Sequence, residues 1–108
     1  MLIAEAAVTT DRASRYLTQL CQHLEAIAQA RAQMPVRVEW GDDTGLITLG
    51  AARCALQARA GALILRAEAP DEQSLQQIER RLTDRLEQIG RRDQLTVTWI
   101  PHTADDVV

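Results

Sequence analysis

The chain has few aromatic residues and no lysine. Of its 108 residues only 3% are aromatic, namely Tyr16, Trp40 and Trp99, and none is phenylalanine. The core must therefore consist of leucine, isoleucine, valine and alanine, within a hydrophobic fraction of 46% that is ordinary for a globular protein. All twelve basic residues are arginine. Because the chain is also rich in alanine, we attribute the missing lysine to biased codon usage and not to function.

The charge and the short apolar runs of the chain exclude several classes of protein. A net charge of -3 and an isoelectric point near 5.3 argue against nucleic-acid binding, which usually requires a basic surface. No apolar run approaches the roughly 18 residues of a membrane span, and the N-terminus lacks the basic start of a signal peptide. We therefore expect a cytoplasmic protein with no nucleic-acid or membrane partner, in which Cys21 and Cys54 stay reduced.

The sequence also lacks the short patterns that mark common catalytic and cofactor sites. It contains no HExxH, GxSxG, Walker A or GxGxxG pattern. Its five glycines fall at predicted turns or at a helix end, which leaves no glycine loop for a phosphate. The two cysteines match no zinc-binding spacing. We expect no metal and no cofactor, and the sequence identifies no catalytic residues.

Hydrophobic periodicity predicts a β-α-β-β-β-β-α-β order of elements. Alternating apolar residues predict strands over residues 2–8, 36–40, 46–49, 53–58, 62–69 and 95–99. Apolar residues at steps of three and four predict helices over residues 11–30 and 70–89. The simplest packing is an α+β two-layer sandwich, with both helices on one face of a mainly antiparallel sheet. We expect one domain at residues 1–100 and a flexible acidic tail at residues 101–108.

The stretch "RYLTQLCQHLE" in the first predicted helix places Cys21 and His23 two residues apart. Residues at this spacing lie about 200° apart around a helix, so the two side chains cannot face the same metal ion. We therefore interpret Cys21 as a small buried side chain, and Cys54, which points inward from a predicted strand, in the same way.

One edge of the same helix is a candidate ligand-binding surface. Arg12, Tyr16, Gln19 and His23 follow one another at steps of four, three and four residues and therefore line this edge. A histidine can titrate near neutral pH, which suits either ligand binding or acid–base chemistry. The alternative is a boundary histidine that bonds only to backbone or solvent.

The outer face of the predicted sheet is a candidate interface. Aliphatic side chains point to this face among several arginines, an arrangement that suits a dimer interface or an anionic ligand. The alternative is a half-solvated antiparallel face with scattered aliphatic residues. The candidate interface residues are Ile3, Leu46, Ala55, Ile64, Arg66 and Ile100.

Three stretches of the chain resemble a bacterial family. They are "TTDRASRYLTQLCQHL", "VRVEW…TGLITLGAARCALQA" and "LILRAEAPDEQSLQQIERRLTDRLEQIGRRDQLTVTW", which together extend to about Trp99. On these stretches the chain resembles a divergent member of the domain of unknown function family 2218. The resemblance implies a fold but little function, because the family has no assigned activity. Some relatives are joined to siderophore-interacting, flavin-type reductase domains, which implies an iron-linked role.

The chain departs from the family pattern at several positions. Family members carry a second histidine where this chain has Ala26, and a His-Leu pair where it has Arg85 and Leu86. They carry aromatic residues where it has Leu24 and Ile89. The departures remove histidines that the resemblance would otherwise imply.

Three functions are compatible with these observations. We favour a non-enzymatic accessory or binding domain that associates with itself through its sheet as a dimer. The first alternative is an iron-, haem- or siderophore-linked accessory protein. The second is a small enzyme that uses the helix edge from Arg12 to His23. The sequence does not identify any small-molecule or protein partner.

Overall fold

A computed structural model describes residues 2–30 and 36–102, and residues 1, 31–35 and 103–108 lie outside the described part. Its elements follow the predicted order. They are β1 (Leu2–Thr9), α1 (Ala13–Ala30), β2 (Val36–Trp40), β3 (Thr44–Leu49), β4 (Ala52–Arg59), β5 (Ala62–Ala69), α2 (Glu72–Ile89), the short 3-10 helix η1 (Arg91–Asp93) and β6 (Ile100–His102).

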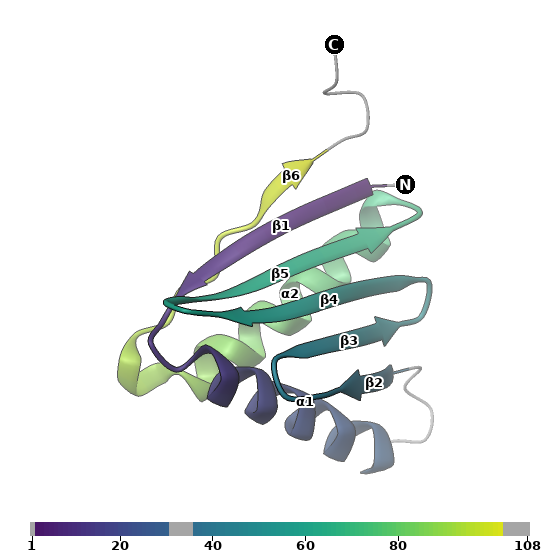
Figure 1. Cartoon of the computed structure of the whole chain (residues 1–108). Helices are drawn as coiled ribbons and strands as arrows, with labels where there is room; N and C mark the ends of the chain where they lie inside the picture. The colour runs from purple at the N-terminus through teal and green to yellow at the C-terminus, as the bar shows by residue number, and fades with distance from the viewer. Residues whose placement is uncertain (1, 31–35, 103–108) are drawn as a thin grey trace.

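The strands form one six-stranded sheet with the order β2-β3-β4-β5-β1-β6. Each pairing between described neighbours is antiparallel. Both helices lie against the same face of the sheet, and no helix of the described residues covers the other face, which we call the bare face (Figure 1). The predicted α+β two-layer sandwich is therefore confirmed.

The core lies between the sheet and the two helices and is almost entirely aliphatic. Strand alternation places every second side chain of β1, β4 and β5 against the helices, as the burial of these strands shows. The helices contribute one apolar stripe each, because three- and four-residue steps keep side chains on one face. The largest fully buried side chains are Leu17, Leu20, Ile47, Leu63, Leu65, Ile78, Leu82, Leu86, Val8, Cys21 and Cys54.

The start of α2 differs from the prediction by two residues. The sequence placed Pro70 in the first turn of this helix, but α2 begins at Glu72. Asp71 is the N-cap, with an extended backbone and a side chain that accepts a hydrogen bond of 2.7 Å from the Ser74 backbone N–H. A side-chain cap of this kind satisfies a free N–H at the helix end, whereas Pro70 only precedes it.

Gly90 ends α2 as predicted, but a packing contact explains the glycine better than its backbone conformation. Its φ is -95°, which other residues adopt freely. A Cβ at this position would lie 2.3 Å from Cδ1 of Leu95, a side chain that turns back onto the helix end and is buried. Glycine is therefore required because Leu95 occupies the space that a side chain would fill.

The predicted last strand over residues 95–99 is wrong. The segment carries no ladder pairing, and the strand β6 instead covers Ile100–His102, where it pairs with β1 at the sheet edge. Side chains of α2 hold the segment: the Val97 N–H donates to Glu87 at 3.2 Å, and the Trp99 Nε1 donates to Thr83 Oγ1 at 2.8 Å. The chain therefore joins the sheet only after Trp99. The remainder of the predicted tail, residues 103–108, lies outside the described residues.

Candidate functional site

The structure divides the predicted helix edge into two parts. At the start of α1, the Tyr16 hydroxyl donates a short hydrogen bond to an Asp93 carboxylate oxygen, and Arg12 Nη1 lies 3.7 Å from the same oxygen. The hydrogen bond to Asp93, together with burial, raises the pKa of Tyr16 above its ordinary value. Tyr16 is buried and Arg12 is exposed. The contacts of Tyr16 and Arg12 with Asp93 therefore hold η1 against the start of α1.

Asp93 is the partner that the sequence did not reveal. It lies 77 residues from Tyr16 along the chain, and η1 was not predicted. A single aspartate next to two arginines in a loop has the pattern of an ordinary solvated turn. Only the packing of α2 beside α1 brings Asp93 to the tyrosine.

Gln19 and His23, the other two residues of the edge, line a hollow of about 610 Å³ between α1 and α2. His23 is exposed, and Arg85 and Ile89 border the hollow from α2. Among the described residues that line it, there is no carboxylate, no cysteine and no second histidine. The edge thus contributes one titratable side chain to this hollow and not a catalytic pair.

Three of the residues that depart from the pattern of the resemblance line the same hollow, whereas Leu24 does not. Ala26 and Arg85, which occupy positions where the resemblance implies histidine, both line it together with His23. Ile89, at a position with an aromatic residue in the family pattern, also borders it. In this chain the hollow therefore has an arginine and aliphatic side chains where the pattern implies histidines and an aromatic ring.

Cys21 and Cys54 are both buried and free. Burial raises the pKa of each thiol to about 12, so neither forms a thiolate near neutral pH. Within the described part of the chain, no three side chains of His, Cys, Asp or Glu lie close enough together to hold a metal ion. The two cysteines act as small core residues.

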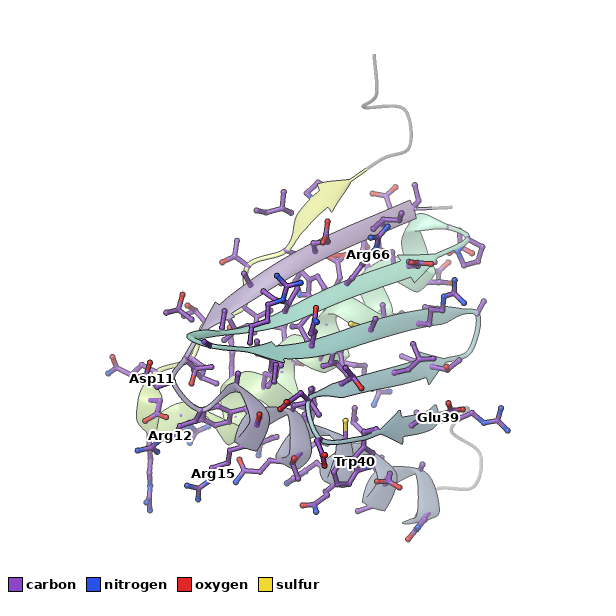
Figure 2. All side chains as sticks on the ribbon, viewed as in Figure 1. Asp11, Arg12, Arg15, Glu39, Trp40 and Arg66 are labelled. Atoms are coloured by element: carbon purple, nitrogen blue, oxygen red, sulfur yellow. The ribbon has the colours of Figure 1, made fainter. Side chains whose placement is uncertain are left out.

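All six predicted interface residues lie on the bare face of the sheet. Ile3, Leu46 and Ile64 are partly buried there, whereas Ile100 is 60% exposed at the edge. Figure 2 shows Arg66, labelled on β5, on the face that points away from the helices. The strand register aligns Arg66 with Glu5 on one side and with Ala55 on the other.

Two arginines of this face, Arg53 and Arg66, contact the carboxylate of Glu68, whereas Arg59 donates to the side chain of Gln57. Arg53 donates to Glu68 Oε2 from Nη2 at 2.9 Å and from Nε at 3.2 Å. Arg66 Nε lies 3.6 Å from the other oxygen of the same carboxylate. The arginines were expected around an aliphatic patch, but the register places Arg66 within it. The bare face is therefore a mixed surface of aliphatic side chains and ion pairs.

The structure adds a groove that the sequence did not indicate. It lies between α2 and the β3–β4 turn at Gly50 and Ala51, and it has a volume of about 750 Å³. Arg80, Arg81 and Arg85 line it from one flank of α2. We call this feature the α2 groove. Its sequence signal is weak, since arginines on the outer side of a helix usually form an ordinary solvated face.

None of the described helices is long and apolar enough to cross a membrane. A search among curated proteins finds no match to the chain. Among solved structures, the NMR structure of PA4090 from Pseudomonas aeruginosa is similar, with a TM-score of 0.71 and 26% sequence identity. The similarity covers 93% of this chain and 96% of that one, so it extends over the whole fold.

The family comparison agrees with the resemblance seen in the sequence. The family model that matches the chain is described as an uncharacterized protein conserved in bacteria (DUF2218). The match covers residues 5–100, from the middle of β1 to the start of β6. It thus includes both helices and all the strands between them. The chain belongs to this uncharacterized bacterial family.

Proposed function

We propose that this chain is a non-enzymatic binding domain that pairs with a second copy of itself through the bare face of its sheet. The observation that carries the proposal is the asymmetry of the two layers: both helices cover one face of a six-stranded sheet and leave the other open. Partly buried aliphatic side chains lie on that open face at Ile3, Leu46 and Ile64.

The charges of the open face support pairing between identical copies. Glu68 offsets part of the positive charge of Arg53 and Arg66 within one chain, and the register places Glu5 beside Arg66, so the repulsion between two such faces is reduced. A two-fold axis places the same surface on both partners, so the charged part of such a face is self-complementary when it carries both signs of charge. A face with arginines alone would repel its copy.

The proposed location is the cytoplasm. Two free, buried thiols suit a reducing compartment, where disulfides rarely form. Neither the iron-linked alternative nor the enzyme alternative gains a specific observation. Among the described residues that line the hollow beside His23, Arg85 is present but a second acid–base group is not, and none of them orients the histidine for acid–base catalysis.

Sedimentation tests the proposed dimer directly. Ile64→Glu places a charge in the middle of the open face, and burying it without a partner would be unfavourable. We expect the wild type to sediment as a dimer and the variant as a folded monomer, because Ile64 does not contact the helix layer. Gln73→Glu is a matched control, since it adds the same charge at an exposed position of α2.

A wild type that remains monomeric at its highest soluble concentration would overturn the proposal. So would a Gln73→Glu variant that dissociates as fully as Ile64→Glu, because the effect would then come from net charge alone. Circular dichroism of each variant confirms that the monomer is folded before its mass is interpreted.

A further inference from the structure

The α2 groove concentrates positive charge on an otherwise acidic chain. Arg80, Arg81 and Arg85 line it from α2, and Asp84 is the carboxylate among the described residues that line it. The chain as a whole has a net charge of -3. Because the groove carries three guanidinium groups and one carboxylate, its potential is opposite in sign to that of the whole chain.

The arginines of the groove have no carboxylate partner in the part of the chain that the structure describes. No carboxylate oxygen there lies within 4.0 Å of a guanidinium nitrogen of Arg80, Arg81 or Arg85. Arg85 Nη1 makes one long hydrogen bond of 3.4 Å to Gln88. The Asp84 carboxylate lines the same groove and still forms no ion pair with them. Their donors therefore remain available to an anion.

Two of these arginines lie beside apolar side chains of the core. Arg81 and Arg85 border not only the groove but also a small apolar gap between the helices and the sheet. Leu49, Ile78 and Leu82 line that gap with them. The aliphatic stems can therefore lie on the core while the guanidinium groups stay at the surface. An anion bound beside such an apolar wall is attracted more strongly than one in open water.

We infer that the α2 groove binds a small, multiply charged oxyanion, with phosphate or carboxylate groups. The planar guanidinium group donates two parallel hydrogen bonds to either kind of group. Ser74 and Gln77 line the groove and add neutral hydrogen-bonding groups, which help to orient a ligand. Its volume of about 750 Å³ lies in the range of small-molecule sites. This inference is independent of the proposed dimer, because the groove lies on the helix layer.

Titration with pyrophosphate and with citrate, followed by NMR of isotope-labelled protein, tests the inference. We expect shifts at the groove arginines and at the Gly50–Ala51 turn. Arg81→Gln/Arg85→Gln should weaken binding on the order of tenfold or more, since each lost charge-assisted hydrogen bond contributes to affinity. Arg91→Gln/Arg92→Gln is the matched control, because it removes the same charge from the exposed helix η1. It should change binding less than about threefold.

Asp84→Asn provides a second test that does not remove an arginine. Removal of the carboxylate that faces the anion should tighten binding, by about two- to fivefold for an exposed charge. Binding of pyrophosphate alone would identify phosphate groups as the ligand chemistry, and binding of citrate alone would identify carboxylates. Absence of binding of both probes at about 10 mM would overturn the inference. Equal weakening by the two double variants would also overturn it, since the attraction would then be non-specific.

Discussion

The bare sheet face and the α2 groove are both rich in arginine, but they differ in whether a carboxylate of the chain pairs with these arginines. On the sheet, Arg53 and Arg66 share the carboxylate of Glu68. In the groove, Arg80 and Arg81 have no carboxylate within 4.0 Å among the described residues. The same residue type therefore forms ion pairs within the chain in one place and a surface that attracts anions in the other.

The geometry of the two secondary structures explains this contrast. In the sheet, cross-strand neighbours lie about 5 Å apart and keep one another in place, and the register puts Arg53 directly beside Glu68. On α2, the residue four positions after Arg81 is Arg85, which repels it, and Asp84 follows Arg80 in the less favourable order for a helix ion pair. Strand register in the sheet and residue spacing along the helix thus decide whether an arginine meets a carboxylate.

Both surfaces depend on one core, so a core substitution should affect them together. Leu20 is fully buried at the middle of α1. Leu20→Ala should lower the free energy of unfolding by about 2–5 kcal/mol, because it removes apolar contacts and leaves a cavity. Urea unfolding at fixed protein concentration measures this effect. Arg15→Ala, on the exposed side of the helix, should change the free energy by no more than about 0.5 kcal/mol. Similar losses in the two variants would show that α1 is packed with a different face inward.

A substitution at the end of α2 should affect the helix layer and leave the sheet face intact. The Cβ of Gly90→Ala would overlap the Leu95 side chain and lie 2.9 Å from its Cβ, so either Leu95 or the end of the helix must move. Urea unfolding should show a loss of about 1–3 kcal/mol, typical of overpacking. Gly41→Ala is the control, since nothing lies within 4 Å of its added methyl group. If Gly90→Ala proved as stable as the control, the packing of Leu95 against the helix end would be incorrect.

Glu68→Gln should make the sheet face resemble the α2 groove, with arginines that lack a carboxylate partner and attract anions. It removes the carboxylate shared by Arg53 and Arg66. We expect a loss of less than about 1 kcal/mol in the free energy of unfolding, since exposed ion pairs contribute little. Pyrophosphate should then perturb the NMR signals of both arginines, which it leaves unchanged in the wild type. Unchanged signals in the variant would mean that pairing with Glu68 does not distinguish the two surfaces.

The smallest expected effect is a pH dependence of the free energy of unfolding, which arises at the N-cap of α2, the helix that carries the groove. The Ser74 backbone N–H lowers the pKa of the Asp71 carboxyl below its ordinary value. A carboxyl with a lowered folded-state pKa stabilises the fold above its unfolded-state pKa, and this stabilisation is lost as the pH falls through the folded-state pKa. Asp71→Asn retains a good N-cap but cannot ionise.

Urea unfolding of both proteins from neutral to acid pH tests this effect. The wild type should be slightly more stable than Asp71→Asn near neutral pH, and the difference should vanish in acid. The remaining carboxylates are common to both proteins and cancel in the difference. A difference that stays constant over the whole range would assign the capping to hydrogen bonding alone.

The order of the elements and the composition of the core follow from local patterns alone. Periods of two and 3.6 residues are visible along the chain, so the strands, the helices and the burial of Leu20 and Cys54 are predictable. The absence of a strand over residues 95–99 was not predictable, because Thr83 and Glu87 hold this segment through contacts that no periodicity records.

The sites depend on contacts between residues far apart in the chain. The spacing along one helix placed Tyr16 and His23 on a common edge, but only the position of η1 separates them by binding Tyr16 to Asp93. Likewise, the alternation of β5 places Arg66 on the outer face, whereas its sharing of Glu68 with Arg53 depends on the strand register. Short-range periodicity thus predicts which side of an element each residue faces. Which partner it meets there is determined by the packing of the elements, because hydrogen bonds and ion pairs depend on a few ångströms of separation.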